Sequence, residues 1–245
     1  MALFTDGEVS SIEDLRGHDT QLLEVANVEG IDVTRKLQLA QEEIAAEVTT
    51  LLGRLNYPPA ASRVVVTPTL KLWHTYLTLE MVYRDAYRSQ LNDRYAGKRD
   101  EFHGMVKWAY DKVIQTGLGM SYDPVARAAS PHVLPVSGGL PDGSYFVAAT
   151  WTNAAGSEGA VSTPVTIEIA GSSFAVTPGA APPNAKGWNV YAGTGPEALT
   201  LQNDTPLGLD RAWPQPNTIA NGGHSAGSGQ SPDYLLPVPR TILRG

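Results

Sequence analysis

The sequence predicts an α+β protein of two domains, in which an N-terminal α-helical bundle precedes a C-terminal antiparallel β-sandwich and an extended C-terminal arm. Three observations predict this class. Apolar residues recur at three- and four-residue steps in the first half of the chain and alternate with polar residues in the second half. Residues 1–127 carry 32 of the 43 charged side chains, and glycine and proline cluster after Tyr122. Such a change of composition marks a boundary between two folds.

The length and composition of the chain agree with this division. A chain of 245 residues, 42% of them hydrophobic, is long enough for one large domain or two small ones. Residues 123–139 contain three prolines, and residues 223–231 are rich in glycine and serine. The expected segments are a helical domain (1–122), a linker (123–139), the β-sandwich (140–222), and a flexible linker with a docking arm (223–245).

Capping residues and prolines set the limits of the expected helices. Ser11 and Asp14 form a capping-box pattern, and Asp32 is a second N-cap candidate. The prolines at 58 and 59 end the helix that Asp32 begins. Apolar residues lie on two faces of the segment 67–92, so we expect two neighbours to cover that helix. The expected helices are a short one ending near Gly17, a second over residues 19–28, and three long ones over residues 32–56, 67–92 and 97–116.

Short alternating runs separated by glycine-rich turns predict the sandwich. Trp151, Trp188 and Tyr191 are the expected core aromatic residues, because a small sandwich needs large side chains inside. A platform on which carbohydrate stacks is the functional alternative for them. The expected strands cover residues 144–153, 161–169, 174–176, 187–191 and 199–201.

The last fourteen residues, Pro232–Gly245, contain three prolines, which forbid a helix, and too many apolar residues for a solvated tail. We expect an extended arm that docks on a partner, for instance by adding a strand to the partner's sheet. A tail folded onto the chain's own sandwich is the alternative. Deletion of residues 232–245 is expected to leave the fold intact. The expected docking residues are Tyr234, Leu235, Leu236, Val238, Ile242 and Leu243.

Composition argues against several classes of function. No run approaches the ~18 consecutive apolar residues of a membrane span, so we expect a soluble or peripheral protein without membrane partners. The opening residues lack the basic and apolar regions of a secretory signal. The absence of cysteine excludes disulfides, cysteine-ligated zinc and thiol catalysis. A net charge of −7 argues against a protein that grips nucleic acid over a broad basic face.

Catalytic patterns are weak. Gly223-His224-Ser225-Ala226-Gly227 matches the GxSxG pattern of serine hydrolases, but neither a buried strand nor a helix flanks it, so a chance match in a linker is favoured. The five histidines are far apart in the sequence and lack paired ligand spacing. Asp100, Glu101 and His103 could share a metal, although neighbouring cations favour a solvated helix face. We therefore expect no enzyme activity, no catalytic residue, no cofactor and no metal.

The charge of the first domain is polarised. Residues 1–50 hold 11 acidic and 3 basic side chains, whereas residues 51–127 hold 7 acidic and 11 basic ones. Two solvated faces of a monomer explain this pattern. Complementary contacts between neighbouring copies in a ring explain it equally well.

The segment Thr69–Met120 resembles the helical core of the head–tail connector adaptors, or head-completion proteins, of tailed bacteriophages. The resemblance extends over about residues 1–122 and includes the opening LFTDGEVSSIEDL, the aromatic-rich helix end near Tyr83, and the YAGK link at residues 95–98. In the second half, SYFVAATWTNAAGSEGAVS and GWNVYAGTG resemble immunoglobulin-like or fibronectin type III-like modules of phage structural proteins. Their order is a departure, because the strand pair that comes late in ordinary fibronectin modules comes first here.

This resemblance implies a structural virion protein at the head–tail interface, or neck, that is assembled in the bacterial cytoplasm. Such adaptors form a ring, commonly of twelve copies, between the portal protein and the downstream neck or tail protein. Genomic DNA passes through the ring without specific binding, and the arm reaches the portal or a neighbouring subunit. The alternative is a tail, baseplate or fibre component whose immunoglobulin-like module binds cell-surface glycans through exposed aromatic residues such as Trp213.

Overall fold

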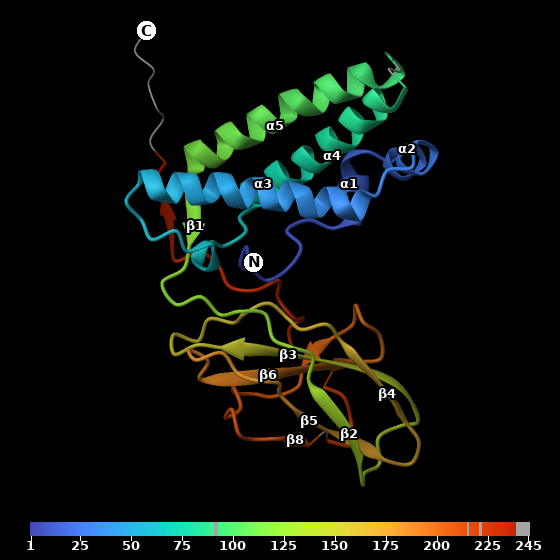
Figure 1. Cartoon of the computed structure of the whole chain (residues 1–245). Helices are drawn as coiled ribbons and strands as arrows, with labels where there is room; N and C mark the ends of the chain where they lie inside the picture. Colours follow the sequence, from blue (N-terminus) through green and yellow to red (C-terminus); the bar gives the residue numbers. More distant parts are fainter. Residues whose placement is uncertain (91–92, 215, 221, 239–245) are drawn as a thin grey trace. The chain divides into compact units, whose positions relative to one another are not determined.

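The computed structural model describes residues 1–90, 93–214, 216–220 and 222–238. The chain forms two compact units (Figure 1). The helical unit contains Gly7–Ser121 and the segment that begins at Pro232, and the β unit contains Met1–Asp6 and Tyr122–Ser231. The chain thus passes from one unit to the other three times. The expected α+β class, with helices preceding antiparallel sheets, is confirmed.

The five expected helices are confirmed, with caps that follow from their sequences. The Ser11 hydroxyl accepts a hydrogen bond from the Asp14 backbone N–H, and the Asp14 side chain accepts one from the Ser11 backbone N–H, which completes the capping box. Asp32 accepts a hydrogen bond from the Arg35 N–H at 3.0 Å. The helices are α1 (Ile12–His18), α2 (Leu22–Glu29), α3 (Val33–Arg54), α4 (Pro68–Gln90) and α5 (Ala96–Thr116), with short 3₁₀ turns at Ala61–Arg63 and Asp93–Tyr95.

Helix α4 is the centre of the helical unit. It packs against α1, α2, α3 and α5, and its longest contact is with α5, which runs beside it (Figure 1). Trp73, Leu79 and Val82 of α4 are all buried. The expectation that neighbours cover two faces of this helix is therefore confirmed.

A small sheet completes the helical unit. Strand β1 (Leu118–Met120) pairs antiparallel with β9 (Tyr234–Leu236). On the other side of β1, the Val65 N–H donates to the Gly119 carbonyl at 2.9 Å, and Val64 forms an isolated bridge with Met120. The end of the segment Gly7–Ser121 therefore pairs with the segment that begins at Pro232.

Among the described residues of the β unit, seven further strands form two antiparallel sheets. The four-stranded sheet has the order β4-β3-β6-β7, and the three-stranded sheet has the order β2-β5-β8. The strands are β2 (His132–Val136), β3 (Gly143–Thr152), β4 (Val165–Ile169), β5 (Ser173–Thr177), β6 (Gly187–Gly193), β7 (Thr200–Leu201) and β8 (Trp213–Pro214).

Both sheets contribute to one hydrophobic core. Trp151 of β3 lies opposite Trp188 of β6 in the register, and both are buried. Phe174 and Trp213 come from the three-stranded sheet and join the same cluster. Tyr191 is also fully buried, in a second small cluster. The three aromatic residues expected inside the β unit are thus confirmed as buried.

The stretch 123–139, expected as a linker, lies within the β unit. It contains β2, and Val125 and Ala128 belong to the hydrophobic core. Its prolines suit this role, because Pro135 stands in a strand at the edge of its sheet, where a missing N–H is tolerated.

None of the helices in the described part of the chain combines the length and apolar character that a membrane span requires.

Candidate functional site

The first three of the expected docking residues form a strand of the chain's own helical unit. Tyr234, Leu235 and Leu236 form β9, which lies opposite Met120, Gly119 and Leu118 in register. The Tyr234 hydroxyl hydrogen-bonds the Tyr57 hydroxyl, Val238 is buried, and the Leu235 side chain is 50% exposed. Ile242 and Leu243 lie outside the described residues. The described part of the arm therefore folds back, onto the helical unit rather than onto the β-sheets.

Two glycines leave room for this return of the chain. Gly117 has φ +89°, and a Cβ atom there would stand 2.6 Å from the Leu236 carbonyl oxygen. A Cβ atom at Gly119 would stand 2.7 Å from Cγ2 of Thr67. Glycine is needed where a positive φ and a close backbone approach coincide. The two glycines on either side of Leu118 are thus explained by packing.

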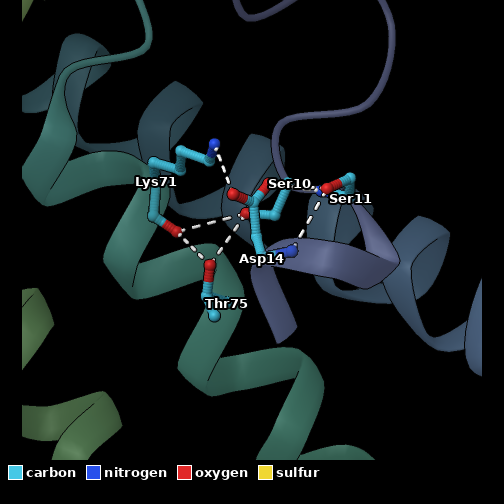
Figure 2. A network of polar contacts seen from close by, with 5 residues as sticks. All are labelled: Ser10, Ser11, Asp14, Lys71 and Thr75. Atoms are coloured by element: carbon cyan, nitrogen blue, oxygen red, sulfur yellow. Dashed lines mark hydrogen bonds and ion pairs between the residues drawn. The ribbon is translucent and has the colours of Figure 1, made fainter. Parts of the chain in front are cut away.

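Helix α1 is fixed to the first turns of α4 by polar contacts (Figure 2). The Lys71 ammonium lies 2.8 Å from the Asp14 carboxylate, and the Ser10 hydroxyl lies 2.9 Å from the Thr75 hydroxyl. Burial alone would raise the pKa of Asp14. The hydrogen bond with Lys71, the hydrogen bonds from Ser11 and the charge of Lys71 outweigh burial, so this pKa lies below its ordinary value.

His74 joins α4 to α3 in the helical core. Its Nε2 atom lies 3.1 Å from the Leu37 carbonyl oxygen, so that nitrogen carries the proton and donates. The Nδ1 atom is buried without a hydrogen-bond partner among the described residues. Burial lowers the pKa of His74 to about 4, against a weaker opposing effect of the Leu37 hydrogen bond. The imidazole is therefore neutral at pH 7 and has a structural role.

A second polar cluster joins the C-cap of α1 to α4 and α5. The Tyr83 hydroxyl donates to the Asp19 carboxylate at 2.6 Å, and the Lys98 ammonium lies 3.5 Å from the same oxygen. Burial, followed by the hydrogen bond to Asp19, raises the pKa of Tyr83. The Tyr83 ring stacks on Phe102 with centroids 5.5 Å apart. The aromatic-rich helix end that carries the phage resemblance is thus a packing element.

Ion pairs between described residues connect residues 1–50 with residues 51–127 inside one chain. They are Asp14–Lys71, Asp19–Lys98 and Lys36–Asp85. Part of the charge difference between the two segments is therefore satisfied within the helical unit. Other charged side chains of this unit are exposed, including Glu43 on α3 and Lys107 on α5.

The GxSxG pattern does not form a nucleophile elbow. Ser225 forms an isolated bridge with Thr200, and the described residues after it contain no helix. The His224 Nε2 atom lies 3.2 Å from the Tyr191 hydroxyl rather than serving Ser225. The Tyr191 hydroxyl in turn donates to the Glu158 carboxylate at 2.8 Å, and burial with this hydrogen bond raises the pKa of Tyr191.

The candidate metal ligands on α5 pair with other groups. Asp100 binds Arg99 at 2.8 Å, Glu101 lies 3.6 Å from Lys98, and His103 lies 3.2 Å from Glu80. The described residues contain no group of three or more acidic, histidine or cysteine side chains that could hold a metal ion.

A groove of about 520 Å³ opens between α3, α4 and α5. Trp73, Leu77 and Val106 form its apolar lining, and Glu43 and Glu47 stand on the α3 side. On the α5 side are Tyr110 and Lys107. The Tyr110 hydroxyl donates to Glu47 at 2.9 Å, and its ring meets the Trp73 ring edge to face at 5.1 Å. These contacts fix the shape of the groove, which can receive an apolar group beside a cation.

Trp108 is the most exposed aromatic side chain of the described helical unit. Half of its surface is accessible, and the Lys112 ammonium lies 5.8 Å from its ring centroid. Aromatic residues are enriched at protein interfaces, and tryptophan often contributes a large share of the binding free energy there. The groove and Trp108 together form the candidate interaction site of the helical unit.

No family model, curated protein or solved structure matches the chain.

One feature of the sequence could have indicated Trp108, the exposed part of this site. Trp108 falls outside the apolar stripe of its helix, which runs through Phe102, Met105, Val106, Ala109 and Val113. A large aromatic residue on the polar face is therefore a sign of an interaction surface. The groove had no such signal, because it depends on how three helices pack.

Proposed function

We propose that this chain is a structural virion protein that forms an adaptor ring, of about twelve copies, between the portal and the downstream neck or tail protein of a tailed phage. In this role it extends the DNA exit channel and catalyses no reaction. The ring would be located at the neck of the virion and assembled in the host cytoplasm. The proposal rests on the sequence resemblance together with the architecture of the helical unit.

The observation that carries the proposal is the structure of the segment Thr69–Met120. This segment forms α4, α5 and β1, two long antiparallel helices that lead into a short strand. Helix α3 of 22 residues packs against α4 of this pair. Three long helices with a buried, interlocked core give a rigid body, which a ring with one repeated contact requires.

We also propose that the β unit is an immunoglobulin-like module with a permuted strand order. In the immunoglobulin fold the strands C, F and G lie side by side in one sheet. Here β6, β3 and β4 lie side by side in that order. If β3 and β4 correspond to F and G, and β6 to C, the late strand pair comes first in the chain. This assignment accounts for the unusual order of the two motifs in the sequence.

Trp213, the aromatic residue expected to bind glycans in the alternative function, is not exposed. Trp213 is only 7% exposed and packs in the core with its ring centroid 6.4 Å from that of Phe174. Truncation of Trp213 would therefore test folding rather than binding.

The proposed function is tested by adding purified protein to DNA-filled heads that carry a portal but lack this protein, and imaging the portal vertex. We expect a ring of new density below the portal. A Leu235→Asp variant, altered at an exposed position of β9, should keep its fold and lose this attachment. Heads that stay undecorated by the unaltered protein would contradict the proposed function.

A further inference from the structure

The groove and the patch around Trp108 are complementary in chemistry. The groove presents an apolar lining and two α3 carboxylates, and the patch presents an indole ring with an ammonium group beside it. Glu43 has no ion-pair partner among the described residues, and its side chain is exposed. An ammonium group that approached the groove together with the indole ring could therefore form an ion pair with the Glu43 carboxylate.

The two surfaces lie on different sides of α5. Val106 and Tyr110 line the groove. Trp108 is two residues beyond Val106, which is about 200° around the helix axis, so it points away from the groove of its own chain. Trp108 therefore cannot fill that groove in the same copy. A second copy can place its Trp108 there, and its own groove then remains open for a third.

We propose that Trp108 of one copy inserts into the groove between α3 and α5 of the next copy, with Lys112 directed toward Glu43 and Glu47. This inference rests on the proposed ring and names its subunit contact. Two different patches that meet head to tail make a heterologous interface, and such an interface closes into a ring when the rotation between copies allows it. Burial of the half-exposed indole is the main gain, and the charge pairs set the orientation.

A cross-linking experiment tests the contact directly, because the chain contains no cysteine. Ala46 lines the groove and is exposed. Gly104 lies four residues before Trp108 on the same face of α5, and a Cβ atom there has open space. A variant with both Gly104→Cys and Ala46→Cys, which keeps Trp108, should give, on mild oxidation, a ladder of disulfide-linked trimers and larger species. Each single-cysteine variant should stop at the dimer. A double variant at high protein concentration that yields no species above the dimer would overturn the proposal.

Sedimentation velocity tests the energetics of the same contact. Trp108→Ala should raise the protein concentration needed for half-maximal assembly by about tenfold or more. Tyr122→Ala, which removes a 68% exposed aromatic side chain of the β unit, is the matched control and should leave it unchanged. Lys112→Glu should weaken assembly, and adding Glu43→Lys to it should restore a large part. Equal assembly of the Trp108→Ala variant and the unaltered chain would contradict the proposal.

The inference and the proposed function can fail separately. If the unaltered chain decorates portal-bearing heads as a ring and the double-cysteine variant does so without cross-linked species, the adaptor function stands and this subunit contact is wrong. If the ladder forms but heads stay undecorated, the contact stands and the adaptor function is wrong.

Discussion

At the scale of single residues, the helical unit depends on buried polar side chains whose partners lie on other helices. His74 bonds the Leu37 carbonyl of α3, and Tyr83 bonds Asp19. A buried polar group that loses its partner costs about 1–3 kcal/mol, so each of these bonds selects one packing of the helices. His74 is distinctive because burial also disfavours its charged form.

The burial of His74 predicts a loss of stability in mild acid. Its pKa is about 4 in the folded chain and 6.5 as the ordinary value, so the unfolded chain binds the proton more readily. Stability from this residue is therefore fully present above pH 6.5 and is lost as the pH falls toward 4. The expected loss at pH 5 is about 2 kcal/mol.

Urea unfolding at pH 7 and pH 5 measures this effect. A His74→Gln variant keeps a donor for the Leu37 carbonyl but does not titrate, so its free energy of unfolding should change less between the two pH values than that of the unaltered chain. His132→Gln, on the exposed face of β2, is the control and should keep the full dependence. Equal pH dependence in the His74→Gln variant and the unaltered chain would refute the assignment.

At the scale of elements, the pairing of β9 with β1 gives the C-terminal segment a structural role that its sequence did not predict. Its sequence suggested an arm that could be deleted without loss of fold. The structure instead places Tyr234–Leu236 on β1, buries Val238, and adds a hydrogen bond from the Ser121 hydroxyl to Asp233 at 3.1 Å. The segment that begins at Pro232 is therefore a structural part of the helical unit.

Ending the chain after Ser231 should lower its free energy of unfolding by about 2–4 kcal/mol, because the backbone pairs of β9 and the burial of Val238 are lost. Chemical denaturation measures the change. Ending the chain after Val238 keeps every described contact and is the control. If the chain that ends after Ser231 is as stable as the full chain, the segment from Pro232 can be deleted without loss of fold, and this prediction is wrong.

The helices were predictable from the sequence because their determinants are local. Ser11, Asp32 and Gly30 mark helix ends through contacts within one turn, and the apolar stripes need only the helix period. Strands β1 and β9 were missed because three-residue strands have no period to detect and are fixed by pairing between residues more than 110 positions apart. The groove was missed for the same reason. Trp108 was not predicted either, although its position outside the apolar stripe of α5 was a local signal.

At the scale of the whole molecule, each end of the chain belongs to the unit that is more distant from it in sequence. The first six residues belong to the β unit, where Leu3 and Phe4 are buried and the Asp6 carboxylate accepts a hydrogen bond from the Arg127 N–H at 2.9 Å. The segment from Pro232 belongs to the helical unit. Each unit therefore contains a short segment that is separated in sequence from the rest of the unit by the larger segment of the other unit.

This exchange predicts that two neighbouring substitutions weaken different units. Phe4→Ala removes a buried side chain of the β unit, and Val9→Ala, five residues later, removes one of the helical unit. Losses of about 3 kcal/mol and about 1–2 kcal/mol respectively follow from the volumes removed. Hydrogen exchange of the full chain, read by mass spectrometry, locates each loss.

Phe4→Ala should speed amide exchange within Tyr122–Ser231 and leave α3, α4 and α5 protected, whereas Val9→Ala should do the reverse. Each variant is the control for the other, since both lie in the same short stretch of sequence. If Phe4→Ala accelerates exchange in the helices as much as in the β-sheets, the two units unfold as one. The opening residues would then act on the molecule as a whole.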